Sequence, residues 1–203
     1  MGNPFKVMLW GYLMVLFTAV VAVFAPAYDS FYTITIVATV FVLLLLLPII
    51  LFLQYWSNKK KATALTMTYQ VYVSLFLLTY PLLKVLKEEM FYQLLLVGLF
   101  ISIYFLGRFD QRTEVPIVFP DKDRDNANVK TWFAYMYYVI PAILTFLGVG
   151  GDHIRLRILF DIYGDKVMMP YLSILIYILA CWFLFLISSM TYKSHVKEGY
   201  LDK

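Results

Sequence analysis

Hydrophobic and polar positions divide this chain into six long apolar runs separated by charged segments. A run of about 20 apolar residues, wound as a helix, matches the roughly 30 Å hydrocarbon layer of a bilayer. The pattern therefore predicts six transmembrane helices. The runs without any Asp, Glu, Lys or Arg are Val7–Tyr28, Ser30–Asn58, Ala62–Leu83, Met90–Gly107, Thr131–Gly151 and Val167–Tyr192. The predicted spans are about 7–28, 31–56, 62–83, 90–107, 131–151 and 167–192.

Composition supports a membrane protein and excludes other classes. Hydrophobic residues make up 62% of the chain and charged residues 15%, whereas about a quarter of a soluble domain is charged. Blocks such as 43–47 are apolar on every side, which excludes the alternating strands of a membrane barrel. The fold class predicted is an all-α, polytopic transmembrane bundle that forms a single integral membrane domain over residues 1–203.

The distribution of basic residues predicts the orientation. Twelve Lys and Arg residues fall in the N-terminus, second loop, fourth loop and C-terminus, against five in the first, third and fifth loops. Cytoplasmic segments are enriched in Lys and Arg, so both termini are predicted to be cytoplasmic. The net charge of +4 needs no nucleic-acid partner, because basic residues beside spans follow from topology and anionic lipid.

Two loops are long enough to contact other molecules. The cytoplasmic loop 108–130 contains two prolines and a run of mixed charges, so it is predicted to be irregular. The external loop 150–166 repeats polar residues every four positions with apolar residues between them, which predicts an amphipathic helix at the membrane interface. Its candidate partner or interface contacts are His153, Arg157, Asp161 and Asp165.

The third span is the most polar of the six. Thr66, Gln70 and Ser74 lie one turn apart along it and are predicted to face inward, with Gln93 of the fourth span as a partner in a polar seam. One interpretation is a solute pathway, and the other is hydrogen bonding between helices, at roughly 0.6 kcal/mol per contact. The pattern favours hydrogen bonding between helices.

The second and fifth runs share a short segment that begins with proline. Residues 48–53 read PIILFL and residues 141–147 read PAILTFL, each in the middle helix of a three-helix half. Related halves with odd numbers of spans occur in transporters, where broken helices mark the solute site. One short match in a Leu-rich chain also arises by chance, so a repeat is not predicted.

No catalytic, cofactor or metal site is predicted. Asp121, Asp123 and Asp125 match the start of a calcium loop, but the glycine and glutamate that such a loop requires later are missing. The predicted topology places His153 and His195 on opposite sides of the membrane, and Cys181 lies mid-span. The six spans contain no charge, which argues against a proton relay through a buried carboxylate.

Three functional hypotheses follow. The first is a non-catalytic protein that acts through a protein partner, as a subunit of a membrane transport or secretion assembly or as a membrane immunity protein. The second is a small-solute transporter or channel with a pathway along the third span, and the third is an enzyme at the outer face. Besides the lipid bilayer, the expected partner is thus a protein and not a nucleic acid, and the composition indicates the cytoplasmic membrane of a bacterium.

Overall fold

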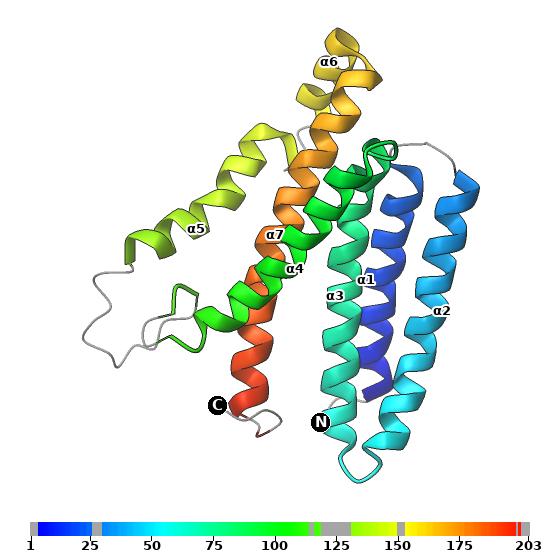
Figure 1. Ribbon diagram of the computed structural model, residues 1–203, viewed down its shortest axis with the longest axis vertical. Helices are drawn as coiled ribbons and strands as arrows, with labels where there is room; N and C mark the ends of the chain where they lie inside the picture. The colour runs from blue at the N-terminus through cyan, green and yellow to red at the C-terminus, as the bar shows by residue number, and fades with distance from the viewer. Residues whose placement is uncertain are drawn as a thin grey trace. The chain divides into compact units, whose positions relative to one another are not determined.

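The fold is all-α. The computed structural model describes residues 4–25, 30–113, 116–118, 131–149, 153–197 and 199, and no strand occurs among them. Figure 1 shows the helices in chain order. They are α1 (Pro4–Phe24), α2 (Ser30–Gln54), α3 (Lys59–Val85), α4 (Met90–Asp110), α5 (Thr131–Leu144), the π-helix η1 (Thr145–Val149), α6 (His153–Tyr163) and α7 (Asp165–Lys197).

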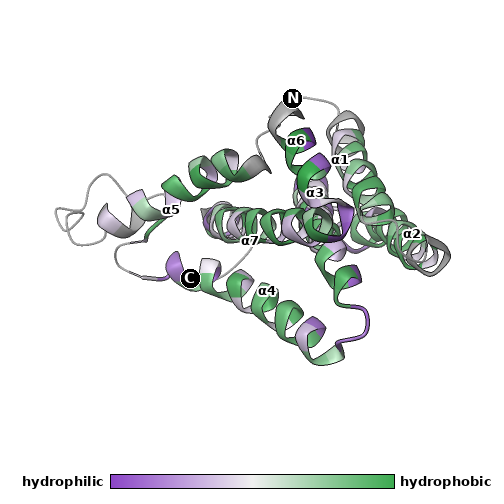
Figure 2. Cartoon of the chain, turned by 90° about the horizontal axis from the view of Figure 1, so that it is seen from above, coloured by the Kyte–Doolittle hydropathy of each residue, from purple (hydrophilic) through white to green (hydrophobic). Residues whose placement is uncertain are grey.

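Four of these helices are long and apolar enough to cross a membrane. They are α3, α4, the part of α2 from Ile34 to Gln54, and the part of α7 that ends at Val196. Two shorter apolar helices, Leu9–Phe24 and Tyr135–Leu147, coincide with the first and fifth predicted spans. The prediction of helix at all six runs is confirmed, and Figure 2 shows hydrophobic residues along most of their length. A multi-pass membrane protein follows from the four long helices.

The chain packs as two compact units, Met1–Val85 and Leu86–Lys203. In the first unit α1 packs mainly against α3, and α2 covers both of them more loosely. Figure 1 shows that α1 and α3 run in the same direction, with α2 antiparallel to them. Small buried side chains from α1 and α3 allow the close approach of these two backbones, as is usual between membrane helices. These side chains are Thr18, Ala19, Ala22, Ala62, Thr66 and Ser74.

A short turn connects α2 to α3, where three consecutive lysines predict a turn at the headgroups. Asn58 precedes α3, and its side-chain Oδ1 accepts the backbone N–H of Lys61 at 3.1 Å, which is an N-cap. The ammonium groups of Lys59 and Lys61 lie over the rings of Trp56 and Tyr55, at 5.5 and 4.7 Å. A turn between the two helices is confirmed, but it lies at residues 55–58, because the three lysines form the first turn of α3.

In the second unit α4 packs mainly against α7, and α5, η1 and α6 contact α7 as well. Figure 1 shows α4 and α7 running in the same direction. Gly107 gives the closest approach: a Cβ there would overlap the Ser188 hydroxyl and lie 2.8 Å from the Phe185 carbonyl oxygen. The hydroxyl of Ser189 donates to the Gly107 carbonyl at 3.0 Å. Glycine is therefore required at this helix crossing.

Prolines within α2 and α5 each free one carbonyl, and a side chain from a neighbouring helix binds it. Pro48 has no N–H for the carbonyl of Leu44, and the Tyr12 hydroxyl donates to that oxygen at 3.2 Å. Pro141 has no N–H for the carbonyl of Tyr137, and Trp182 Nε1 donates to it at 2.9 Å. Each donor comes from another helix of the same unit, so the proline both creates and positions an interhelical hydrogen bond.

The contact between α5 and α7 is reciprocal. The Tyr137 hydroxyl donates to the carbonyl of Trp182 at 2.8 Å, while the indole of Trp182 donates back to Tyr137. The two rings stack with their centroids 5.2 Å apart. The helix continues through Pro141 but becomes π-helical from Thr145, one turn later, whereas α2 continues through Pro48 without interruption.

Residues 153–163 form α6, the helix predicted between the fifth and sixth runs. It ends at Gly164, whose φ of +71° is the left-handed conformation favoured by glycine, and α7 starts at the next residue. The Gly164 N–H donates to Phe160 O at 2.8 Å. With 11 residues, α6 is too short to cross a bilayer.

The predicted irregular loop 108–130 starts as helix, because α4 continues to Asp110. The buried Asp110 carboxylate accepts the backbone N–H groups of Ile117 at 2.8 Å and Val118 at 3.2 Å. Gln111 Nε2 donates to Val118 O at 2.7 Å. Residues 116–118 are thus fastened to the end of α4. The aspartates 121, 123 and 125 lie outside the described residues.

Replacing Trp182 by Phe removes the donor to Tyr137 O and is expected to lower the free energy of unfolding by about 1–2 kcal/mol. In a Pro141→Ala background, the backbone N–H of the alanine can donate to Tyr137 O in place of the indole. We therefore expect Trp182→Phe to cost about 0.5–1 kcal/mol less in that background than in wild type. The measurement is a double-mutant cycle by detergent-titrated unfolding, followed by circular dichroism. Trp132→Phe, at an exposed tryptophan of α5, is the control. An equal cost in both backgrounds would contradict the assignment.

Candidate functional site: the polar stripe of α3

Three polar side chains form a fully buried stripe along α3. Thr66, Gln70 and Ser74 lie four residues apart, on one face of the helix, and each is 0% exposed. All three lie inside the first unit. The inward orientation that the sequence predicts for them is therefore what the structure shows, and their functional role stays a prediction.

The stripe packs against the backbone of α1. A Cβ built on Gly11 would overlap Oε1 of Gln70 and lie 2.6 Å from its Cδ, so no side chain fits between them. The adjacent Tyr12 hydroxyl hydrogen-bonds with the Gln70 side chain and donates to Leu44 O. Through Tyr12, the amide of Gln70 is linked to the proline-freed carbonyl of α2.

The two hydroxyls of the stripe differ in their hydrogen bonds. Thr66 Oγ1 donates to Ala62 O, one turn earlier, at 2.9 Å. Ser74 Oγ is equally buried but has no hydrogen-bond partner within the described part of the chain. Because burying a hydroxyl without a partner costs free energy, a bound polar group would stabilise Ser74.

Lys84 is a buried cation that lies just beyond the predicted third span, 62–83. It lies in the last turn of α3, is 7% exposed, and its Nζ donates to the carbonyl oxygen of Val23 at 3.0 Å. Val23 is in the last turn of α1, where carbonyls lack helical partners and a positive charge is favourable. The contact spans 61 positions of sequence, so no local pattern could have revealed it.

The remaining predicted site residues do not join this stripe within the first unit. Gln93 is half-buried and belongs to α4 of the second unit. Arg157 and Asp161 are exposed one turn apart on α6, and Asp165 is exposed at the start of α7. His153 begins α6, but its side chain lies outside the described residues. Arg157, Asp161 and Asp165 are thus accessible, and their partner contacts stay predictions.

The chain has no match that would name its function. No known protein family, characterised protein or solved structure matched the chain significantly. What it does must therefore be inferred from its own residues.

Gly11→Ala should lower the free energy of unfolding by about 1–3 kcal/mol, because the new methyl group must displace the buried Gln70 amide. Gly98→Ala in α4 is the matched control: a Cβ there meets nothing within 4 Å, so a change within about 0.5 kcal/mol is expected. Both variants can be compared by unfolding in mixed micelles. If Gly11→Ala were as stable as wild type, the tight packing of the stripe would be refuted.

Proposed function

We propose that this chain is a six-span protein of the bacterial cytoplasmic membrane, with both termini cytoplasmic, that acts through a protein partner. Such a partner would make it a subunit of a transport or secretion assembly, or a membrane immunity protein. Support for six spans comes from four long apolar helices together with α1, whose 21 residues reach about 31 Å, and the apolar segment α5–η1.

The observation that carries the proposal is the closed packing of the α3 stripe. Thr66, Gln70 and Ser74 are the polar residues best placed to line a path, yet each is fully buried. Gly11 lies so close to Gln70 that not even a methyl group fits between them. A stripe packed in this way contributes to helix association rather than to conduction. Polar groups available for recognition are then those at the ends of the helices.

Helix α6 is the surface proposed for partner contact. It exposes Arg157 and Asp161 one turn apart, and the apolar side chains Ile158 and Ile162 are exposed beside them. A single residue, Gly164, separates α6 from α7. A helix that presents a charge pair next to apolar side chains suits a membrane-protein partner at the outer face, which can cover both.

Asp161→Arg is expected to abolish co-purification of a stoichiometric partner. The change replaces a carboxylate with a positive charge, which would repel the partner groups that bind Asp161 at the proposed contact. Tagged wild type and variant would be purified from native membranes in mild detergent, and bound proteins quantified by mass spectrometry. Glu88→Arg makes the same charge change at another exposed position between α3 and α4 and should retain the partner. Equal recovery with Asp161→Arg, or no stoichiometric partner with wild type, would contradict the proposal.

Small-solute transport along α3 is the second candidate, and Ser74 is the observation that favours it. Its hydroxyl is buried without a hydrogen-bond partner in the described residues, which a polar solute could supply. Replacing Gln70 with Leu separates the two functions. If the stripe serves packing, solute flux into vesicles that contain the protein should equal that of empty vesicles for wild type and variant alike. Flux that requires wild-type Gln70 would establish transport instead.

A further inference from the structure

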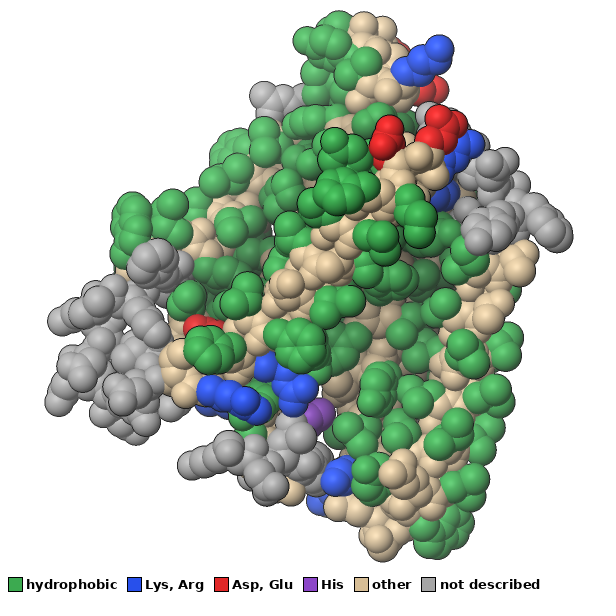
Figure 3. All heavy atoms as spheres, viewed as in Figure 1, with side chains coloured by type: hydrophobic (Ala, Val, Ile, Leu, Met, Phe, Trp, Pro, Cys, Tyr) green, Lys and Arg blue, Asp and Glu red, His purple; other side chains and the backbone are tan. Residues whose placement is uncertain are grey.

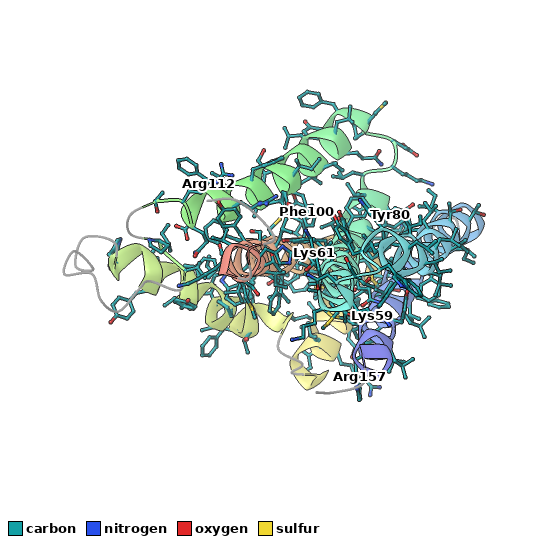
Figure 4. All side chains as sticks on the ribbon, turned by 90° about the horizontal axis from the view of Figure 1, so that it is seen from below. Lys59, Lys61, Tyr80, Phe100, Arg112 and Arg157 are labelled. Atoms are coloured by element: carbon teal, nitrogen blue, oxygen red, sulfur yellow. The ribbon has the colours of Figure 1, made fainter. Side chains whose placement is uncertain are left out.

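Two arginines and a tyrosine form a compact cluster where α4 ends beside α7. Arg108 lies in the last turn of α4, and Arg112 follows it by one helical turn. Their guanidinium carbons lie 5.3 and 5.4 Å from the centre of the same ring, that of Tyr192. Figure 4 labels Arg112 at the end of α4, and Figure 3 shows Lys and Arg side chains gathered in this region.

Hydrogen bonds fix both guanidinium groups in place. Arg112 Nε donates to the Tyr192 hydroxyl at 3.0 Å, and Arg108 Nη1 donates to the Tyr104 hydroxyl at 2.8 Å. Tyr192 is 6% exposed, so both guanidinium groups lie against a buried side chain. A guanidinium carries five N–H donors, and these bonds use one on each arginine. The cluster therefore presents further donors in a preorganised arrangement.

Asp110 lies between the two arginines in the sequence, but its carboxylate binds other groups. Asp110 accepts the backbone N–H groups of Ile117 and Val118 and the amide of Gln111. It fastens the following loop rather than pairing with the cations. Two positive charges beside one ring repel each other, and a bound anion would relieve this repulsion.

The position of the cluster along the helices indicates which class of anion it would meet. Arg108 and Arg112 stand at the end of the candidate span Met90–Asp110, and Tyr192 ends the predicted span 167–192. Such ends lie at the depth of the lipid headgroups, on the side predicted to be cytoplasmic, where anionic phospholipids are enriched. The planar fork of arginine matches phosphate oxygens with two parallel hydrogen bonds.

We propose that Arg108 and Arg112, held on Tyr192 and Tyr104, form a binding site for a phosphate group, supplied by the headgroup of an anionic phospholipid. The ligand is a phosphodiester that carries a net negative charge, such as phosphatidylglycerol. A zwitterionic phosphatidylcholine offers the same phosphate but a quaternary ammonium beside it, which two nearby guanidinium groups disfavour. The site is independent of the partner proposed above.

Native mass spectrometry of the full-length protein tests this site. Wild type would be released from nanodiscs with equal amounts of phosphatidylglycerol and phosphatidylcholine, and retained lipids counted. We expect retention of phosphatidylglycerol over phosphatidylcholine, weakened about fivefold by Arg108→Gln or Arg112→Gln and more by both. Lys166→Gln removes an exposed cation at the opposite end of α7 from Tyr192 and is the matched control, with unchanged retention expected.

Added inorganic phosphate identifies the source of the group. Displacement of the lipid only by other anionic lipids supports a headgroup site, while displacement by millimolar phosphate supports the same arginines binding a soluble phosphate. If wild type shows no preference for phosphatidylglycerol, or if a folded double variant retains it as wild type does, the proposal is overturned. The wild-type comparison decides the matter even where the double variant fails to fold.

Discussion

The hydrogen bonding of backbone carbonyls in a medium without water is the constraint on which the rest of this structure depends. An α-helix satisfies its own carbonyls, but a proline removes one donor, and hydrocarbon cannot replace it. Here Pro48 and Pro141 each leave one carbonyl, and Tyr12 and Trp182 bind the two oxygens. The prolines thus define where α1 and α7 must contact the middle helix of each unit.

Close approach of parallel helices is the second recurrent feature. In each unit a glycine on the first helix abuts a polar side chain on the last: Gly11 meets Gln70 and Gly107 meets Ser188. Interhelical association in lipid gains little from apolar burial, so close backbone contact and hydrogen bonds supply the attraction. Each unit therefore has its own proline-freed carbonyl and its own glycine contact, although the other helices of the two units differ.

Several charged groups in the described residues lie near helix ends and make specific contacts there. Lys84 binds the carbonyl of Val23 at the end of α1, and Asp110 binds the loop that follows α4. Arg108 and Arg112 surround Tyr192 at the end of α7. These contacts bind polar groups near the ends of α1, α4 and α7, whereas α6 exposes Arg157 and Asp161.

The sequence by itself determined the positions of the helices and the inward side of α3. Both follow from local periodicity, because apolar runs must wind into helices in lipid and polar residues four apart share one face. The break between the second and third helices and the helix within 150–166 were predictable for the same reason. Only the tertiary structure decided the partners of these elements. Three contacts illustrate this: Lys84 with Val23, Trp182 with Tyr137 O, and Gly11 with Gln70. Each joins two different helices, across 45 to 61 positions of sequence. No local pattern encodes such pairs, since they depend on which helices pack together.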